Sequence, residues 1–399
     1  MAIHLSRDAI ALILAGGNGT RLGELTRWQC KPAIPFGGQF RNIDFTLSNC
    51  VNSGVRKIAV LTQYKAQSLI AHVTGGWDFL PRALGEFVDV WPAQQRIHTG
   101  WYAGTADAVY QNLDQVLAQR TPYTLVLAGD HIYKMDYRRL LEQHVASGAQ
   151  VTVGCAPVPA EEAGAFGVLD VDAAQRVRSF IEKPAPSSLG VSPNTSVLAS
   201  MGIYVFSTDY LAAALTRDAS DACSGHDFGR NILPHAVREG AAVAHRFLDE
   251  LGRPGYWRDV GTLDSFWHAH MELLAAEPPI DLYDPAWPIR THSEPLPPAK
   301  LLCDPARHGG VVNSLVAGGT VVRNATVTNS VLSANVSVGE NTILDEVVIL
   351  PDVRIGANCR LRRVIIDSNT VVPDGTVAGG GRVQLLTRDA EADELRSVA

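Results

Sequence analysis

Glycines and basic residues come together in the loop that follows the first apolar run of the chain. The run Ala9–Leu14 leads into Gly16-Gly17-Asn18-Gly19-Thr20-Arg21, and Lys31 follows further along. Glycines let backbone N–H groups approach a phosphate chain, and Arg21 and Lys31 supply positive charge toward its oxygens. The spacing matches neither a P-loop nor the dinucleotide-binding G-x-G-x-x-G. The segment therefore predicts a phosphate-binding loop of another type.

Two aspartates in other loops are candidate metal ligands. Asp130 follows the apolar run that ends at Leu127-Ala128-Gly129, and Asp259 lies in Trp257-Arg258-Asp259-Val260-Gly261, just before a helical pattern. Two carboxylates without a histidine or cysteine cluster favour a hard cation such as Mg²⁺, which shares its coordination shell with substrate phosphates. The alternative for Asp130 is a helix cap, and the sequence does not fix whether the carboxylates converge.

Residues suited to a sugar phosphate occur further along. Glu182-Lys183-Pro184 places a cation beside a carboxylate, just before a proline that ends the strand. Ser200, Tyr204 and Asp227-Phe228 combine hydroxyls, a carboxylate and an aromatic face, which is a mixture that binds sugars. The alternatives are a solvated Glu182–Lys183 pair and an Asp227 that only caps a helix.

The first 276 residues predict an α/β domain with a mainly parallel sheet, because short apolar runs alternate with helical stretches. The runs include Ala9–Leu14, Lys57–Thr62, Thr124–Leu127 and Val151–Cys155, and the helical stretches include Ala106–Ala118 and Leu263–Ala275. In such a sheet, ligands bind at the carboxyl ends of the strands. The loops 16–21 and 129–133 both fit that position.

A proline-rich segment separates this domain from a repetitive C-terminal part. Residues 277–300 contain seven prolines, which exclude helix and interior strand and predict a linker or strap. The C-terminal part, residues 301–399, ends in a short tail. Before this tail, aliphatic residues recur every five or six positions, which predicts a left-handed parallel β-helix of hexapeptide repeats. An irregular β-sandwich is the alternative. The aliphatic series predicted to point inward is Leu315, Val321, Val327, Leu332, Val338, Leu344, Leu350, Ile355, Leu361, Ile366 and Val372.

Composition narrows the classes of protein further. The chain has 399 residues, 34 Lys+Arg against 41 Asp+Glu, and a formal net charge of −7. An acidic chain without a basic run argues against nucleic acid as a partner. The N-terminal apolar run is too short for a membrane helix and lacks the flanks of a signal peptide, so we expect a cytoplasmic protein without a membrane contact. The six widely spaced cysteines predict reduced thiols, not a zinc site or disulfides.

The ordered set of motifs resembles the bacterial glucose-1-phosphate adenylyltransferases, also called ADP-glucose pyrophosphorylases. The likeness runs from about Ile10 to Val372 and extends into the strap and the β-helix. The segments that carry it are Leu14–Leu22, Lys31-Pro32-Ala33, Ile43-Asp44-Phe45, Gln63-Tyr64, 101–108, 129–133, Glu182-Lys183-Pro184, Tyr256–Thr262 and Trp287–Thr291.

The resemblance implies an enzyme that converts ATP and glucose 1-phosphate into ADP-glucose and pyrophosphate with Mg²⁺, the committed step of bacterial glycogen synthesis. Arg21, Lys31 and Asp130 would be catalytic, and Asp130 and Asp259 would bind the metal. The implied nucleotide-binding residues are Leu14, Ala15, Gly16, Gly17, Gly19, Thr20, Gln63, Trp101, Tyr102, Gly104 and Thr105. The implied sugar-phosphate residues are Gly167, Glu182, Lys183, Ser200, Tyr204, Asp227, Phe228 and Trp257.

The resemblance also implies a homotetramer regulated by metabolite effectors, with Arg41 as a candidate effector residue. This chain departs from the members activated by fructose 1,6-bisphosphate, in which the stretch before Lys-Pro-Ala is basic and a histidine precedes Phe-Gly-Gly. Here the stretch reads Thr26-Arg27-Trp28-Gln29-Cys30 and Pro35 precedes Phe36. We therefore expect little activation by that compound.

Two alternatives keep the fold and change the function. One is a sugar nucleotidyltransferase that uses UTP or dTTP. The resemblance argues against it, because those relatives lack the Trp-Tyr-x-Gly-Thr-Ala-Asp-Ala block that this chain has at 101–108. The other is a catalytically silent regulatory subunit of the same fold. A silent subunit is expected to lose a charged catalytic residue. This chain retains all of the charged candidates, which are Arg21, Lys31, Asp130, Lys183 and Asp259.

Overall fold

The computed structural model describes residues 2–17, 19–94, 100–190, 192, 195–249, 251–303 and 309–388, so the tail after residue 388 lies outside the described residues. The chain forms two compact units, each built from separated stretches. The first unit comprises Met1–Gly17 and Phe45–Trp257, and the second comprises Asn18–Asp44 and Arg258–Ala399. The domain boundaries at residues 276 and 300 were placed where the composition of the sequence changes, and they stay a prediction.

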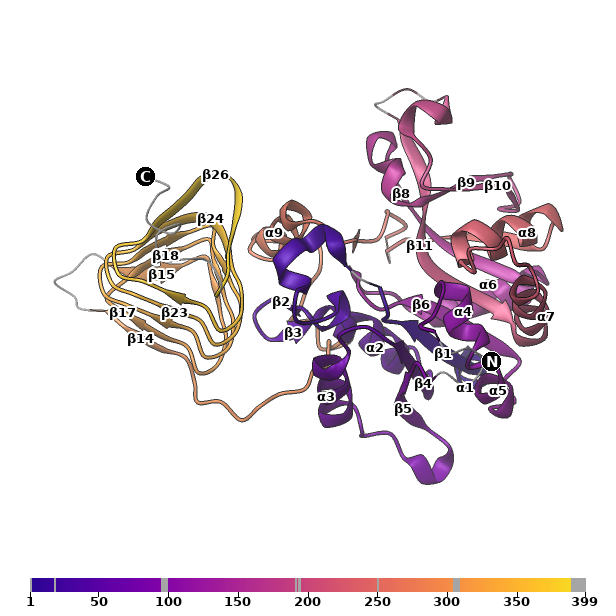
Figure 1. Ribbon diagram of the computed structural model, residues 1–399, viewed down its shortest axis with the longest axis horizontal. Coiled ribbons are helices and arrows are strands. Elements are labelled where there is room, and N and C mark those ends of the chain that lie inside the picture. The colour runs from indigo at the N-terminus through magenta and orange to yellow at the C-terminus, as the bar shows by residue number, and fades with distance from the viewer. Residues whose placement is uncertain are drawn as a thin grey trace. The chain divides into compact units, whose positions relative to one another are not determined.

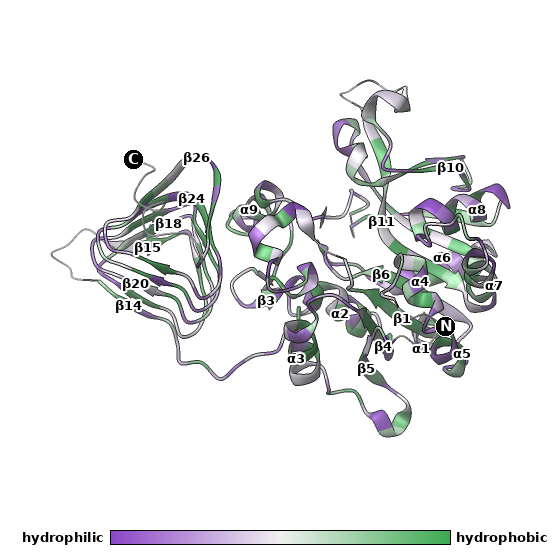
Figure 2. Cartoon of the chain, viewed as in Figure 1, coloured by the Kyte–Doolittle hydropathy of each residue, from purple (hydrophilic) through white to green (hydrophobic). Residues whose placement is uncertain are grey.

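A nine-stranded sheet forms the centre of the first unit. Its parallel block has the order β6 (Tyr123–Ala128), β1 (Ala9–Leu14), β4 (Lys57–Thr62) and β5 (Phe87–Pro92). Five of the six residues of β1 are buried, as in a strand that is covered on both faces. Figure 2 shows hydrophobic colouring along this strand. The predicted α/β domain with a mainly parallel sheet is confirmed here.

The long strand β11 (Ser196–Ser207) extends this block with antiparallel pairing. It pairs with β6, β8 (Val151–Pro159) and β9 (Gly167–Val171), while β10 (Val177–Glu182) pairs with β9, and β12 (Ala242–Arg246) lies parallel to β8. The β11–β8 register shifts between Ser200 and Ile203, where Gly202 has a φ of 67°. The irregularity follows directly after a predicted sugar-binding residue.

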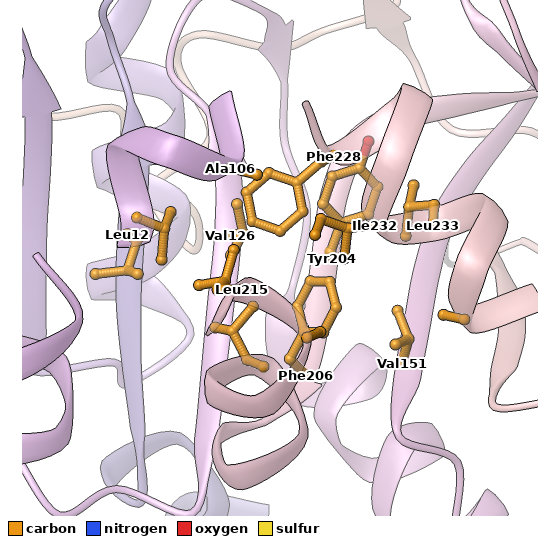
Figure 3. Close-up of a cluster of buried hydrophobic side chains, with 14 of the residues drawn as sticks. Leu12, Ala106, Val126, Val151, Tyr204, Phe206, Leu215, Phe228, Ile232 and Leu233 are labelled. Atoms are coloured by element: carbon orange, nitrogen blue, oxygen red, sulfur yellow. The ribbon is translucent and has the colours of Figure 1, made fainter. Parts of the chain in front are cut away.

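Short helices cover the sheet of the first unit and complete its core. They are α1 (Ala2–Arg7), α2 (Asn42–Asn52, which begins in the second unit), α3 (Gln67–Gly76), α4 (Thr105–Tyr110), α5 (Leu113–Ala118), α6 (Tyr137–Ser147), α7 (Thr208–Ala219) and α8 (Leu233–Arg238). Figure 3 shows Leu12 and Val126 of the sheet near Leu215 of α7 and Phe228. No helix among the described residues is long and apolar enough to cross a membrane.

The helix predicted over Ala106–Ala118 is two helices, α4 and α5, so this prediction is wrong in detail. The Asn112 side-chain amide donates to the Ala108 carbonyl (2.8 Å) and to the Tyr102 hydroxyl (3.0 Å). A side chain that bonds to nearby backbone competes with the helical ladder. Asn112 thus lies at the break and bonds to a residue outside the predicted helix, a contact that periodicity does not reveal.

Parallel coils of short strands form the C-terminal part of the second unit (Figure 1). One face contains β14 (Lys300–Leu302), β17 (Val321–Arg323), β20 (Ser337–Val338), β23 (Arg354–Ile355) and β25 (Val371–Val372). The other faces contain β15 (Gly310–Val312), β16 (Leu315–Val316), β18 (Thr326–Thr328), β19 (Val331–Leu332), β21 (Ile343–Asp345), β22 (Val348–Ile349), β24 (Arg360–Ile366) and β26 (Val377–Leu386). This arrangement agrees with the predicted left-handed β-helix.

Most of the residues that the hexapeptide pattern placed in the interior lie there, with three errors of one position, although the buried cluster also contains residues outside the predicted series, such as Val336, Val347 and Val353. Val327, Leu344 and Leu361 form one row of the buried cluster, as predicted. At Leu315, Val321 and Leu350 the prediction is wrong, because the neighbours Val316, Val322 and Ile349 take the interior places. Each error falls on a pair of adjacent aliphatic residues, between which periodicity alone does not choose.

Asparagines occupy many corners of the β-helix. Asn324, Asn341 and Asn358 recur at an interval of 17 residues, and all three have positive φ angles. Asparagine tolerates the left-handed region better than most residues. The Asn341 side-chain amide also donates to the side-chain Oδ1 of Asn358 in the next coil (3.4 Å), so the corner residues support the stacking as well as the turn.

The N-terminal stretch of the second unit and α9 (Leu263–Glu272) lie against one face of the β-helix. The Trp267 indole of α9 donates to the Glu346 carbonyl (2.8 Å), and the Arg363 guanidinium lies 4.7 Å from the centre of the same ring. The turn between β2 (Pro35–Phe36) and β3 (Phe40–Arg41) reaches this face too, since a Cβ on Gly38 would lie 3.9 Å from Val331. Residues 277–299 of the predicted strap, all described, contain no helix or strand, whereas its last residue, Lys300, begins β14.

Three histidines with a lowered pKa make stability depend on pH. Burial lowers the pKa of His144, His245 and His270 to about 4. In His270 the bond from Nδ1–H to the Phe266 carbonyl (2.8 Å) opposes the effect of burial on the pKa, and Nε2 accepts from Gly37 N–H (3.2 Å). A proton on Nε2 would remove that acceptor inside the core.

We expect the free energy of unfolding to fall between pH 6.5 and 4. In this window the unfolded chain binds more protons than the folded chain, so each such histidine contributes a slope of up to about 1.4 kcal/mol per pH unit. Urea titrations at pH 7 and pH 5 measure the effect. H270Q should reduce the slope, and H268Q, at an exposed position of the same helix, should leave it unchanged. Equal slopes for wild type and H270Q would contradict the assignment.

Candidate active site

The glycine loop after β1 is held against the end of β4. Ala15 N–H donates to the Leu61 carbonyl (2.9 Å), and the Gln63 side-chain amide donates to the Gly16 carbonyl (3.4 Å). A Cβ on Gly16 would lie 3.2 Å from Gln63, whereas a Cβ on Gly17 would meet nothing within 4 Å within the described residues. A side chain at position 16 would therefore crowd Gln63, and Gly17 is exposed.

Gln63 also joins this loop to the segment around Trp101. Its Oε1 accepts from Tyr102 N–H (2.8 Å), so a single side chain bridges Gly16 and Tyr102. Tyr102 is buried, whereas the Trp101 side chain is 65% exposed. An exposed indole beside a fixed backbone is suited to stacking against a base. The first unit thus brings together Gly16, Gln63 and Tyr102, three of the predicted nucleotide-binding residues.

Asp130 lies at the carboxyl end of β6, next to the end of β1. Gly129 N–H donates to the Leu14 carbonyl (3.1 Å), and a Cβ on Gly129 would lie 2.8 Å from Ile13. The Asp130 side chain is 29% exposed, and its Oδ1 lies 3.6 Å from Nε2 of His131. The loops after β1 and β6 therefore share one edge of the sheet, as expected for parallel neighbours.

His131 and Trp257 extend this region toward the predicted sugar-binding residues. The Trp257 indole N–H donates to Nδ1 of His131 (3.2 Å), and the Trp257 ring lies 5.0 Å from that of Phe166. Because Nδ1 accepts, the proton of a neutral His131 sits on Nε2, toward Asp130. Sequence reasoning did not select His131. Its position directly after Asp130 was the one signal for it.

Glu182 and Lys183 form a carboxylate–ammonium pair at the end of β10. Lys183 Nζ lies 3.6 Å from Glu182 Oε1, and the Glu182 side chain is 19% exposed against 53% for Lys183. Burial raises the pKa of the Glu182 carboxyl, although the Lys183 ammonium opposes this shift. The alternative of a solvated pair therefore does not fit Glu182. The exposed Lys183 ammonium is accessible to an anion.

Two glycines leave the space that the Glu182 carboxylate occupies. A Cβ on Gly229 would lie 2.4 Å from Glu182 Oε2, and a Cβ on Gly167 would lie 2.9 Å from the same atom. Gly167 was among the residues implied by the resemblance, whereas Gly229 was not. Gly229 follows Phe228 directly, but nothing in the sequence shows that it faces Glu182.

Ser200, Tyr204 and Asp227 line the same part of the first unit. The Ser200 and Tyr204 hydroxyls are 3.2 Å apart and buried. Burial raises the pKa of Tyr204, and the carboxylates of Glu182 and Asp227 add to this shift. Phe228 is 2% exposed and packs into the core (Figure 3), so its predicted contact with a sugar stays a prediction.

Asp227 also caps a helical segment, as the alternative interpretation predicted. Its Oδ1 accepts from Arg230 N–H (3.0 Å) at the start of the π-helical segment Phe228–Ile232. Its Oδ2 accepts from the Thr105 hydroxyl (2.9 Å). Each carboxylate oxygen can accept more than one hydrogen bond, so capping does not exclude a second role.

In the second unit, the Asp259 carboxylate joins two of the predicted cations. Arg21 donates to Asp259 Oδ2 (3.2 Å), and the Lys31 ammonium donates to Oδ1. The Lys31 side chain is 6% exposed, whereas that of Arg21 is 55% exposed. A Cβ on Gly261 would lie 3.0 Å from both Asp259 oxygens, so this glycine leaves room for the ion pairs.

Backbone contacts fix the segment that carries Lys31. The Asn42 amide donates to the Lys31 carbonyl (3.0 Å), and the Arg41 guanidinium donates to the Ala33 carbonyl (2.9 Å). Burial lowers the pKa of Arg41. Earlier in the chain, Gly19 has a φ of 59°, and a Cβ there would lie 2.9 Å from Thr26. The predicted effector role of Arg41 stays a prediction.

The predicted residues fall into two sets, one in each compact unit. The first unit holds Asp130 with the sugar-binding and most nucleotide-binding candidates, and the second holds Arg21, Lys31 and Asp259. The sharing of one metal ion by Asp130 and Asp259 therefore stays a prediction.

Comparisons with known proteins address the chain as a whole. The family model "Nucleotidyl transferase" matches residues 10–276, and the model "GlmU-like, C-terminal hexapeptide" matches residues 297–390. The glucose-1-phosphate adenylyltransferase of Paraburkholderia phytofirmans is 51% identical over 98% of this chain and 94% of its own length. Those of Nitrosospira multiformis and Nitrosococcus oceani are 50% and 52% identical, each over 94% of this chain and 90% of its own length. The chain belongs to the glucose-1-phosphate adenylyltransferase family, within the nucleotidyltransferases.

Proposed function

We propose that this protein transfers the adenylyl group of ATP to glucose 1-phosphate, forming ADP-glucose and releasing pyrophosphate. The observation that carries the proposal is the match, at about half identity over nearly the full chain, to relatives that bear the name of this activity. The bridging of Gly16 and Tyr102 by Gln63, and the exposed Lys183 beside Glu182, support it.

The reaction forms one bond and breaks one bond at the α-phosphorus of ATP. An oxygen of the sugar phosphate attacks the α-phosphorus, and the bond from that phosphorus to the bridging oxygen breaks, so pyrophosphate leaves with the electron pair. The attacking phosphate is already an anion at neutral pH, so no general base is required. Positioning and charge neutralisation therefore supply the catalysis.

Different basic residues bind and neutralise the phosphates of the two substrates. Lys183 holds the phosphate of glucose 1-phosphate, and Glu182 accepts from sugar hydroxyls. Arg21 and Lys31 neutralise the triphosphate and the leaving pyrophosphate. Their ion pairs with Asp259 keep the two side chains oriented until the phosphates arrive.

Asp130 and Asp259 fit Mg²⁺ as ligands, because both offer the hard carboxylate oxygens that this ion prefers. Asp130 is partly exposed at the carboxyl edge of the sheet, where a phosphate-bound ion has access to it. When bound, Mg²⁺ supplies positive charge between the two anionic substrates. We assign both aspartates to this role.

The decisive test measures pyrophosphate release from ATP, UTP and dTTP with glucose 1-phosphate and Mg²⁺. Release with ATP supports the proposal. Release with UTP or dTTP instead would assign the protein to another sugar specificity of the same fold. Silence with every nucleotide, also in the presence of sugar phosphates and pyruvate, would favour the regulatory subunit.

G229A is expected to raise the KM for glucose 1-phosphate about tenfold, because the new methyl group would displace the Glu182 carboxylate and weaken one charged hydrogen bond. Initial rates at varied sugar phosphate and saturating ATP measure the change. G381A, at an exposed glycine without a positive φ and with no neighbour within 4 Å of its Cβ among the described residues, tests the general cost of losing a glycine. An unchanged KM in G229A would contradict the placement of Glu182.

We further propose a cytoplasmic homotetramer that responds to metabolite effectors. All six cysteines lie in the described part of the chain and none of them forms a disulfide, which suits a reducing compartment.

Fructose 1,6-bisphosphate is expected to raise the rate of pyrophosphate release less than twofold. The stretch 26–30 offers few cations, and each absent charged contact weakens binding by roughly tenfold or more. A dose–response series with strong activation would overturn this expectation.

A further inference from the structure

The start of α4 is locked to the loop that precedes Phe228. The Thr105 hydroxyl donates to Asp227 Oδ2 (2.9 Å) and accepts from Phe228 N–H (3.0 Å). One hydroxyl therefore uses both its donor and an acceptor site on two successive residues of the other segment. The contact joins segments more than 120 residues apart in the chain.

Backbone contacts beside Thr105 strengthen this junction. The His226 carbonyl accepts from Ala106 N–H (2.8 Å) and Asp107 N–H (3.3 Å). A Cβ on Gly104 would lie only 2.2 Å from the same carbonyl oxygen, so the approach requires glycine. His226 has a φ of 51°, an uncommon conformation for a residue with a side chain, and the surrounding contacts hold it there.

Each side of the junction leads to one of the two groups of substrate-binding candidates. Asp107 accepts from Ala103 N–H (2.8 Å), which fixes the segment next to Tyr102 and Gln63. On the other side, a Cβ on Gly229 would lie 3.4 Å from Asp227 Oδ1 and 2.4 Å from Glu182. Asp227 also adds to the raised pKa of Tyr204. Thr105 stands between the two groups.

We propose that Thr105 is a positioning residue for the sugar phosphate, although it lies in the segment assigned to the nucleotide. The inference rests on the proposed function. Thr105 orients the Asp227 carboxylate and holds the Phe228 backbone, so that Asp227 and Glu182 present their oxygens to the sugar in a fixed arrangement. Without the hydroxyl, Phe228 N–H loses its acceptor and Asp227 Oδ2 loses its donor.

The kinetics of T105V, T105S and wild type test the assignment. T105V is expected to raise the KM for glucose 1-phosphate about tenfold and to change the KM for ATP less than twofold. T105S retains the hydroxyl and should restore the wild-type KM. T216V, which removes a hydroxyl bonded within α7, is the matched control and should behave as wild type. Thermal unfolding of each variant shows whether the fold is intact.

Equilibrium binding of glucose 1-phosphate, measured by calorimetry without nucleotide, gives a second reading. T105V should bind it about tenfold more weakly than wild type or T105S. An increase confined to the KM for ATP, or equal losses for both substrates with a lower melting temperature, would overturn the positioning role. If wild type itself neither binds glucose 1-phosphate nor releases pyrophosphate, the proposed function fails before Thr105 is tested.

Discussion

D130N should lower kcat for pyrophosphate release by about a thousandfold at saturating ATP and glucose 1-phosphate. The substitution keeps the size of the side chain and removes its charge. A neutral amide binds Mg²⁺ weakly, so charge repulsion between the two substrates returns at the transition state. Because Asp130 is partly exposed and sits after a buried strand, the fold should tolerate the change.

The measurement follows pyrophosphate release by a coupled assay over a range of Mg²⁺ concentrations. Excess Mg²⁺ should restore part of the rate if the lost group is a metal ligand. D209N, at an exposed aspartate in the first turn of α7, is the control and should keep wild-type activity. A D130N enzyme with more than a tenth of wild-type kcat would sink the metal-ligand assignment.

K183Q should raise the KM for glucose 1-phosphate about a hundredfold while the KM for ATP changes little. The lysine ammonium supplies a charge-assisted hydrogen bond to the sugar phosphate, and glutamine supplies a neutral one. Lys183 is well placed for this role, because its side chain is 53% exposed while its backbone N–H is fixed to the Phe166 carbonyl (2.9 Å).

Two further enzymes complete that experiment. K183R retains the charge with a different shape and is expected to fall between wild type and K183Q. K300Q, which changes an exposed lysine of β14, controls for the loss of one positive charge. A rise in the KM for ATP that equals the rise for glucose 1-phosphate would show that Lys183 serves both substrates and is not specific to the sugar phosphate.

The parts of the fold that local patterns determine could be predicted from the sequence. The runs Ala9–Leu14 and Lys57–Thr62 match strands β1 and β4 residue for residue, because buried parallel strands are continuously apolar. The six-residue period identified the β-helix; its wrong assignments fall on adjacent aliphatic pairs such as Val321-Val322, and it left out interior residues such as Val336 and Val353. Where two neighbours are equally apolar, tertiary packing makes the choice.

The parts that depend on long-range contacts could not be predicted. The break between α4 and α5 lies at Asn112, whose side chain bonds to Tyr102 outside the helix. The Thr105–Asp227 bond and the space that Gly229 leaves for Glu182 join residues far apart in the chain. The charged candidates could be selected because their chemistry is distinctive, whereas Gly229 and Thr105 are ordinary residue types whose contacts with Glu182 and Asp227 only the structure shows.

The contacts of Trp267 bear on how such a chain can be shortened or recombined. A cut in the proline-rich strap retains Lys31 and Asp259 but removes Glu346 and Arg363, the partners of the Trp267 indole. Helix α9 begins four residues after Asp259, so the lost support falls on the element that directly follows this carboxylate in the chain. Chimaeras that exchange whole β-helices between relatives therefore need α9 from the same parent, although the family boundary in the sequence lies beyond it.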